Sequence, residues 1–417
     1  MKTSRSNRKR NRTIRGLVAV ALALGVGVGG CDNLLEVQAP GVIASSAWDD
    51  PANAELLIVS ALGEFECMLP VYIRSTGTIA HELMVSGIIG VWQNWGARWD
   101  ILRNDSGACG NDIGFYNPLQ TARYMADQGY QRIEGFADAQ VRERTSKLAT
   151  LAAYGGYTYT LMGEAMCESA IDGGPLVTRE QLFEMAEERF TAAIDHAQAA
   201  GNAAILNMAR VGRARIRLNL GKRAEAAADA LLVPEGFVRN ATFSDVAVRR
   251  RNSMSVTTHE QRNWSVHFAY HNLEVNGVPD TRVQLFDHKR LGVDAQTPQW
   301  SPMKHSSRSS PIPIARWEEA QLIIAEVEGG QTAVNIINRL RAKRGLPLFV
   351  SSDPAEIAAQ VVEERRRELF LEGHRLNDML RLGIPFPTGV THKGQPYGDA
   401  TCVPLPDAER FNNPNIK

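Results

Sequence analysis

The apolar positions of the chain follow a helical period most clearly in residues 178–232. Residues that step by three and four form the apolar face of a first predicted helix, which ends at Gly201-Asn202. This face comprises Phe183, Ala186, Phe190, Ala193, Ile194 and Ala197. A second helix is predicted up to Gly221 and a third up to Pro234. Such helix pairs resemble tetratricopeptide-type repeats, and a generic helical hairpin fits the spacing about equally well.

Further helices are predicted on both sides of this region. One begins near Pro51, with Asp49 or Asp50 as its cap. Others lie between Asn117 and about Ala170, and from Ile314 onward to Glu328, 332–344 and 354–372. The pattern therefore predicts a mostly α-helical chain.

Two long segments lack this period. Residues 66–116 and 236–310 are rich in turn residues, so they are expected to be mostly loop, with short strands such as WSVHFAY and RVQLF in the second segment. The tail, CVPLPDAERFNNPNIK, is Pro-rich and expected to be extended across the body of the protein.

The first 30 residues have the pattern of a bacterial lipoprotein signal peptide. They hold seven basic groups and no acid, followed by a short apolar run and the sequence Val28-Gly29-Gly30-Cys31. We expect cleavage before Cys31 and lipidation of its thiol, and the alternative is an ordinary signal peptide with a cysteine nearby. The apolar run is shorter than the ~20 residues that a membrane span needs.

Charge then limits the partners of the mature chain. Without residues 1–30, 39 basic groups remain against 46 acidic groups, so the net charge is −7. This balance argues against nucleic-acid binding, which needs a basic surface. No later segment is continuously apolar for ~18 residues, so we expect contact with the membrane through the lipid anchor only.

Four cysteines follow Cys31. Cys67, Cys109, Cys167 and Cys402 lie in a chain expected outside the cytoplasm, where disulfides form. Three pairings are possible, and the sequence does not choose among them. Their long spacings do not favour a zinc site.

The segment EERRRELFLEGHRLNDMLRLG (363–383) concentrates five arginines and four glutamates. Glu363 and Arg367 are four residues apart, and Asp378 and Arg381 three apart, so a helix would pair these charges. Glu372 and Arg375 are also three residues apart. We interpret the segment as structural, because a polyanion-binding face would carry unpaired basic groups. Ion-paired carboxylates have depressed pKa values, which suit a general acid poorly.

Four C-terminal segments resemble the SusD/RagB family of nutrient-binding outer-membrane lipoproteins. They are IPIARWEEAQLIIAEV (312–327), AVNIINRLRAKRGLP (333–347), ERRRELFLEGHRLNDMLR (364–381) and VPLPDAERFNNPNI (403–416). Together they are specific, whereas any one alone would be weak. The lipobox cysteine, LLEVQAPGVI and the helix before Phe65 also resemble the start of the family.

The resemblance implies a SusD-like fold, with tetratricopeptide-like helices at about 117–235 and 311–380 on one side. The irregular ligand side would consist of the loop-rich segments at about 66–116 and 236–310. Residues 31–417 would form a single domain. The resemblance also implies a cell-surface lipoprotein that captures a nutrient, classically a glycan, and delivers it to a TonB-dependent, SusC-like β-barrel transporter in the outer membrane. Peptide nutrients are also possible.

Aromatic side chains flanked by amides and charges are typical of sugar sites, and one such cluster lies in the first loop-rich segment. The ligand-binding candidates are Trp92, Asn94, Trp95, Arg98, Trp99 and Tyr116, with Trp264, Tyr270 and Trp300 in second place. A core-filling role is the competing interpretation for the tryptophans, because large aromatics are mostly buried. Loss of binding without unfolding in Trp92→Ala and Trp95→Ala would support the site, whereas a large drop in melting temperature would mark core residues.

Enzyme signals are weak. The glycine pattern at 25–30 lies inside the signal peptide, and His81-Glu82 lacks the second histidine of a zinc motif. His267 and His271 could chelate a metal only on a helix, and their segment resembles a strand. We therefore predict a non-enzyme with no metal and no cofactor. A helical-repeat scaffold lipoprotein in envelope assembly is the alternative function, and a surface glycan hydrolase is a distant third.

Overall fold

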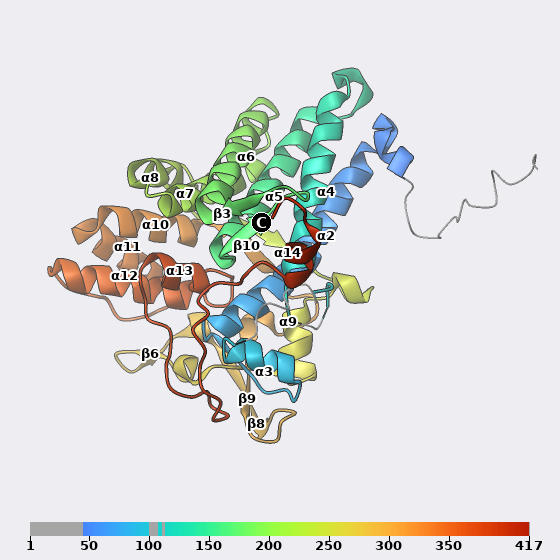
Figure 1. Ribbon diagram of the computed structural model, residues 1–417. Coiled ribbons are helices and arrows are strands. Elements are labelled where there is room, and N and C mark those ends of the chain that lie inside the picture. The colour runs from blue at the N-terminus through green and yellow to red at the C-terminus, as the bar shows by residue number, and fades with distance from the viewer. Residues whose placement is uncertain (1–44, 100–106, 111–112, 417) are drawn as a thin grey trace, which may run out of the picture. The chain divides into compact units, whose positions relative to one another are not determined.

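The computed structural model describes residues 45–99, 107–110 and 113–416 of the 417-residue chain. The predicted signal peptide and Cys31 lie outside the described residues. Asp49–Lys417 form one compact unit, and the elements below belong to it, with the exception of η1 at its start. In Figure 1 its long helices lie side by side, and the hairpins that contain β6, β8 and β9 lie away from the α6–α8 helices.

The helices predicted between residues 117 and 232 are confirmed. They are α4 (Tyr116–Gly135), α5 (Arg144–Ala165), α6 (Arg179–Ala199), α7 (Ala203–Asn219) and α8 (Arg223–Leu231). Thr178 caps α6, because its hydroxyl accepts from the backbone N–H of Gln181 at 3.2 Å. The Gln181 side chain accepts in return from the Thr178 backbone N–H, which completes a capping box.

Phe190 shows how small residues bring these helices together. Its ring is buried where α6 meets α5 and α7. A Cβ on Gly156 would lie 2.7 Å from this ring, and a Cβ on Gly212 would clash with it more severely. The two glycines therefore provide the space that the Phe190 ring occupies.

The prediction of loop from residue 66 onward is wrong for its first part. Helix α2 spans Ala54–Ile79 and continues through Pro70, and every residue from Phe65 to Ile79 is buried. A helix buried on all sides has no polar face, so it gives no amphipathic period. Asp50 caps the preceding turn η2 (Pro51–Asn53), as expected, by accepting from Ala52 N–H at 2.9 Å.

One stretch within the described part of the chain, Pro51–Ile79, is long and apolar enough to cross a membrane. The expectation that no later segment has this character is therefore corrected. The structure buries 67% of its most apolar window. We interpret it as the central core helix of the unit.

The C-terminal helices are α10 (Trp317–Glu328), α11 (Gly330–Ala342), α12 (Pro354–Glu368), α13 (Arg375–Arg381) and α14 (Asp407–Asn412). The predicted helix start at Ile314 is wrong, because Ile312–Arg316 is strand β10, antiparallel to β4. The predicted helix at 354–372 ends earlier, at Glu368. The tail is extended except for α14.

Strands form only two-stranded antiparallel pairs among the described residues. The pairs are β1 (Leu83–Val85) with β5 (Trp264–Val266), β2 (Glu168–Ala170) with β3 (Leu176–Thr178), β4 (Val238–Ala241) with β10, β6 (Glu274–Val275) with β7 (Val278–Pro279), and β8 (Leu285–Leu291) with β9 (Pro298–Pro302). Short helices fill the remaining segments: η1 (Ser45–Asp49), α3 (Gly90–Gly96), η4 (Asp138–Gln140), η5 (Val248–Arg250), α9 (Ser253–Ser255), η6 (Val256–Glu260), η7 (Phe268–Tyr270), η8 (Thr281–Val283) and η9 (Met303–His305). The expectation of loops and short strands in 236–310 is confirmed.

The structure contains one of the three possible disulfide pairings of the four cysteines. Cys67 bonds to Cys109, and Cys167 bonds to Cys402. Next to the second bond, Val403 donates its backbone N–H to Ala165 O at 2.8 Å and accepts from Cys167 N–H at 2.9 Å. The tail is thereby fixed to the end of α5.

The charged segment is structural, as expected, but its pairing is mostly tertiary. Glu363–Arg367 and Asp378–Arg381 pair at 2.6 and 2.7 Å, as the spacing predicts. Glu372, however, pairs with Arg316 at 2.9 Å and with Lys304 at 2.7 Å. Helix α12 ends at Glu368, so Glu372 and Arg375 do not share a helix, and Glu372 pairs with residues from other segments instead.

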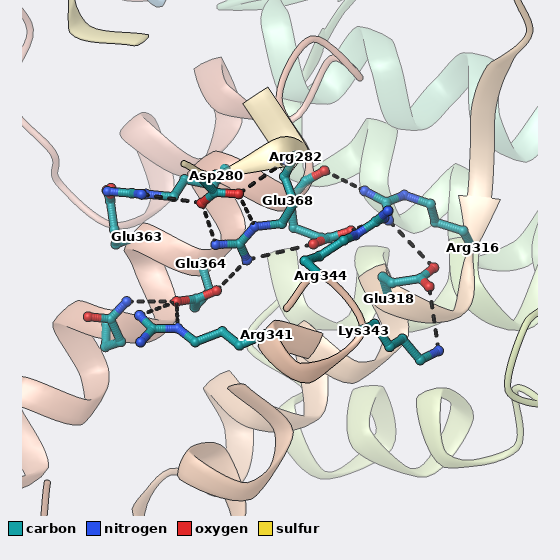
Figure 2. Close-up of polar contacts among 12 residues, drawn as sticks. Asp280, Arg282, Arg316, Glu318, Arg341, Lys343, Arg344, Glu363, Glu364 and Glu368 are labelled. Atoms are coloured by element: carbon teal, nitrogen blue, oxygen red, sulfur yellow. Dashed lines mark hydrogen bonds and ion pairs between the residues drawn. The ribbon is translucent and has the colours of Figure 1, made fainter. Parts of the chain in front are cut away.

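Figure 2 shows the centre of this network. The Glu364 carboxylate forms ion pairs with two arginines. One is Arg282, which follows β7, and the other is Arg341 of α11, whose guanidinium lies 2.7 Å from Glu364. Glu368 receives Arg316 at 2.8 Å. All five side chains are buried, and a buried charge needs such partners. The network therefore joins α11, α12, β10 and the η8 segment.

Candidate functional site

A hollow opens where the end of α2, β1, α3 and β5 meet the loop 391–397. The space enclosed within it is about 20 Å³, room for about one water molecule, so a larger ligand would lie across its mouth. Its polar lining residues are Thr78, His81, Gln93, His267, Thr391, His392, Lys393, Gln395 and Tyr397. We call it the histidine hollow, because three imidazole rings from distant parts of the sequence line it.

His81 is the most deeply placed of these rings. It follows the end of α2 in a left-handed backbone conformation, with φ 59°, which non-glycine residues rarely adopt. Its ring lies 5.0 Å from the Tyr397 ring and 5.4 Å from the His267 ring. The Nε2 atom is buried and finds no hydrogen-bond partner among the described residues. Strained backbone and unsatisfied polar atoms are features that concentrate at functional sites.

The imidazoles of the hollow are uncharged at neutral pH. Burial lowers the pKa of His81 to about 3, with His267 and Arg98 adding repulsion, and burial lowers the pKa of His267 to about 4. The pKa of His392 is also lowered, first by burial. Nδ1 of His267 accepts from Ala269 N–H at 3.2 Å, so its Nε2 carries the proton and is a donor.

The charged groups of the hollow are already engaged. Lys393 pairs with Asp294 at 2.7 Å, and both side chains are mostly buried. His392 donates through Nε2 to Val85 O at 3.2 Å. The hollow therefore presents hydroxyl, amide and imidazole groups rather than a free charge.

Four of the six predicted ligand residues are buried. Trp95 is fully buried and its ring lies 6.4 Å from Phe115, while the Trp92 ring packs 4.6 Å from that of Trp264. Tyr116 is buried at the start of α4. These positions fit the core-filling interpretation and offer no aromatic face to a ligand.

Arg98 is buried too, and it holds the wall of the hollow in place. It donates to Pro387 O at 2.6 Å and to Ala400 O at 3.2 Å. Its guanidinium lies over the rings of Phe386 and Tyr397, at 5.2 and 5.3 Å from their centroids. Arg98 therefore positions the loop that carries Tyr397.

Trp99 is the accessible tryptophan of the cluster, with 49% of its surface exposed. It follows α3, so the three tryptophans do not share one helical face. A Cβ on Gly398 would lie 2.8 Å from Trp99 Cδ1, which places this ring against the residue that follows Tyr397. Asn94 is half-buried. Trp99 and Asn94 remain predictions as ligand contacts.

Sequence reasoning missed His392 and Tyr397 and did not connect His81 with His267. These four residues come from three separate segments, and no local motif joins them. The two histidines at 267 and 271 diverge, because His271 stacks on Trp300 at 4.3 Å while His267 faces His81. In the part of the chain that the structure describes, no group of three or more His, Cys, Asp or Glu residues is placed to hold a metal ion.

Comparison with known proteins bears out the resemblance. The sequence profile of the SusD family matches residues 289–415, which contain three of the C-terminal motifs and all but the last residue of the fourth. No curated protein matches the sequence.

Solved structures share the fold over most of the chain. A SusD-like carbohydrate binding protein from Bacteroides vulgatus is 13% identical, and the alignment covers 88% of this chain and 97% of that one with a TM-score of 0.65. A SusD superfamily protein from Parabacteroides distasonis is 13% identical, with 90% and 99% covered and a TM-score of 0.67. A laminarin binding SusD-like protein is 14% identical, with 88% and 98% covered and a TM-score of 0.64.

Proposed function

We propose that this chain is a member of the SusD/RagB family that captures a glycan at the histidine hollow and delivers it to a TonB-dependent outer-membrane transporter. The observation that carries the proposal is an exposed tryptophan, Trp99, whose ring lies against Gly398, the residue that follows Tyr397 of the hollow. Sugars need both an apolar face and convergent polar groups, and ligand sites generally combine these features. The hollow contributes binding and no catalytic step.

The chemistry of the hollow favours a glycan over a peptide nutrient. Neutral imidazoles donate one hydrogen bond and accept another, as sugar hydroxyls do. A peptide brings charged ends or side chains, and the only cation of the lining, Lys393, is paired with Asp294. The laminarin binding SusD-like protein of the same fold supports a polysaccharide ligand.

The proposal extends to the place of the protein in the cell. A lipid on Cys31 would hold the chain at the outer membrane, exposed at the cell surface and in contact with the membrane only through this anchor. The helical side would face a SusC-like β-barrel partner, and the loop side would carry the glycan. Family membership supports this arrangement.

Affinity electrophoresis tests glycan capture. The mature protein is run through gels that contain laminarin, starch, xylan, dextran or pectin. We expect at least one polysaccharide to retard the wild type and the Trp99→Ala/Tyr397→Ala variant to bind it at least tenfold more weakly, since each aromatic contact adds ~0.5–1.5 kcal/mol beyond its buried area.

Phe411→Ala is the matched control, because this aromatic is strongly exposed and does not line the hollow. Equal retardation of the double variant and the wild type would reject the hollow as the site.

Purification of the lipidated protein in mild detergent tests the partner. Co-purification of a TonB-dependent barrel supports delivery, whereas envelope assembly factors would favour the scaffold alternative.

A further inference from the structure

The protein has a second, larger opening, which shares no lining residue with the histidine hollow. It consists of two adjoining parts that share Thr281 and Gln284, so they form one groove. With open solvent included, the parts hold about 520 and 880 Å³, and the histidine hollow holds about 350 Å³. Trp300 lines one end, and Arg344 and Glu318 line the other. We call it the Trp300 groove.

Trp300 is a fixed aromatic platform at one end of the groove. It lies in β9, and its backbone N–H donates to Ser265 Oγ at 2.9 Å. Its ring stacks on His271, with 4.3 Å between centroids and 26° between planes. His271 is held in turn, because its Nε2 donates to Val266 O at 2.9 Å. The ring is therefore positioned before any ligand arrives.

The floor of the groove is a satisfied ion network, drawn in Figure 2. Arg282 donates to both oxygens of Asp280, at 2.9 and 2.7 Å, and also pairs with Glu364. Arg316 donates to Glu368 at 2.8 Å and pairs with Glu372. These guanidinium groups are committed to protein carboxylates, so the floor does not need a bound anion.

At the far end of the groove, Arg344 and Glu318 can still form hydrogen bonds with a ligand. The Arg344 side chain is 44% exposed, and its contact with Glu368 is long, at 3.6 Å. Glu318 lies 3.5 Å from Arg316 and 3.9 Å from Lys343, both beyond the usual hydrogen-bond distance. Arg344 and Glu318, both labelled in Figure 2, line the same opening, so a donor and an acceptor face it.

We propose that the Trp300 groove is a second glycan site, which takes an uncharged oligosaccharide segment. A sugar ring lies on Trp300, and hydroxyls further along the chain meet Gln284, Arg344 and Glu318. An anionic ligand would meet Glu318 and a cationic one Arg344, so the paired signs favour a neutral polyhydroxylated ligand. The inference rests on the proposed function, because it assumes that the chain binds glycans.

A run of rings connects the two openings. From His267 the rings continue through Phe268, at 5.8 Å, to His271, at 5.5 Å, and then to Trp300. His267 lines the histidine hollow, and Trp300 lines the groove. A polysaccharide long enough to reach both sites would bind with avidity greater than either site alone provides.

The test compares Trp300→Ala and Arg344→Ala with the wild type in the same laminarin, starch, xylan, dextran and pectin gels. Arg142→Ala is the control, because the Arg142 side chain is 91% exposed and lines neither opening. We expect both test variants to bind a retarding polysaccharide three- to tenfold more weakly, and the control to match the wild type. Because Trp300 is half-buried, thermal melting is measured alongside, and Arg344→Ala keeps the test valid if Trp300→Ala fails to fold.

Mobility of Arg344→Ala and of folded Trp300→Ala equal to the wild type in all five gels overturns the second site. The result is separable from failure of the histidine hollow. Loss of binding only in the Trp99→Ala/Tyr397→Ala variant leaves the proposed function intact and removes the groove. Loss only in Trp300→Ala and Arg344→Ala keeps the groove and removes the histidine hollow.

Discussion

The Arg98 guanidinium donates a 2.6 Å hydrogen bond to the backbone carbonyl of Pro387, 289 residues further along the chain. Arg98 also reaches Ala400 O, so one side chain spans both ends of the loop that carries Tyr397. In Arg98→Ala these carbonyls lose their donors. We expect faster hydrogen exchange in residues 386–400 and at least tenfold weaker glycan binding, measured by exchange mass spectrometry and affinity electrophoresis.

Arg142→Ala serves as the control for this prediction too, since it removes an arginine that is almost fully solvated. Arg98→Lys adds a finer comparison, because lysine keeps the charge but lacks the planar fork that reaches two carbonyls. Unchanged exchange across 386–400 in Arg98→Ala would contradict the positioning role.

Trp95→Ala and Trp99→Ala are expected to behave in opposite ways. Trp95 is fully buried, and truncating a buried tryptophan costs ~3–5 kcal/mol of unfolding free energy. Trp99 is half exposed, so its truncation should change stability by about 0.5 kcal/mol or less while weakening glycan binding. Urea unfolding and affinity electrophoresis of both variants measure these effects. Equal stability losses would show that Trp99 is also a core residue.

Acid should destabilise the protein through His81. Its pKa falls from 6.5 when unfolded to about 3 when folded, so the unfolded state binds the proton first as pH falls. Stability from this group is complete above pH 6.5 and decreases below it, by about 2 kcal/mol at pH 5. Burial raises the pKa values of Glu82 and Glu319 to about 7, which works in the opposite direction over the same range.

The variant His81→Asn separates the contribution of His81 to the pH dependence of stability from the contribution of these carboxylates. Asparagine tolerates the left-handed backbone and does not titrate. When the pH is lowered from 7 to 5, the free energy of unfolding of His81→Asn should rise relative to that of the wild type by about 2 kcal/mol, because the loss caused by His81 is absent. Parallel pH profiles for the two proteins would contradict the lowered pKa.

Two helical glycines should respond to alanine with opposite signs. A Cβ on Gly212 would clash with the Phe190 ring, so Gly212→Ala should cost ~1–3 kcal/mol by overpacking. Gly63 has no atom within 4 Å of the added Cβ, so Gly63→Ala should stabilise the interior of α2 by up to ~1 kcal/mol. Thermal melting compares the two directly. Destabilisation by both would indicate that α2 needs the freedom of Gly63.

The elements that could be predicted are those with one buried face. Helix α6 shows both a period of three and four and a Thr178 cap, and both signals are local. The second half of α2 contains Pro70 and is buried on every side, so its sequence gives no period and includes an apparent breaker. The sequence predicts helix over part of strand β10 because Ile312–Arg316 runs directly into α10, and its β4 partner lies more than 70 residues earlier.

The candidate site was less accessible to sequence reasoning. The spacing of Trp92, Trp95 and Trp99 predicts a ligand site in this segment but does not indicate which of the three rings reach the surface. Exposure depends on packing against Trp264 and Phe115, which are distant in sequence. His81, His267 and Tyr397 come together only after β1 pairs with β5 and the tail loop is tied to Arg98. Such contacts have no local signature.

The bond between Cys167 and Cys402 also determines how the protein carries mechanical load. It closes a ring whose ends are 235 positions apart in the chain, and this ring contains α6 to α13. A pulling force on the two termini passes through the disulfide and bypasses everything between these cysteines. On the C-terminal side, the residues that can be drawn out are those beyond Cys402, which lie outside the ring. The Trp300 groove lies inside the unloaded ring, whereas His81, in the histidine hollow, lies in the part that bears the force.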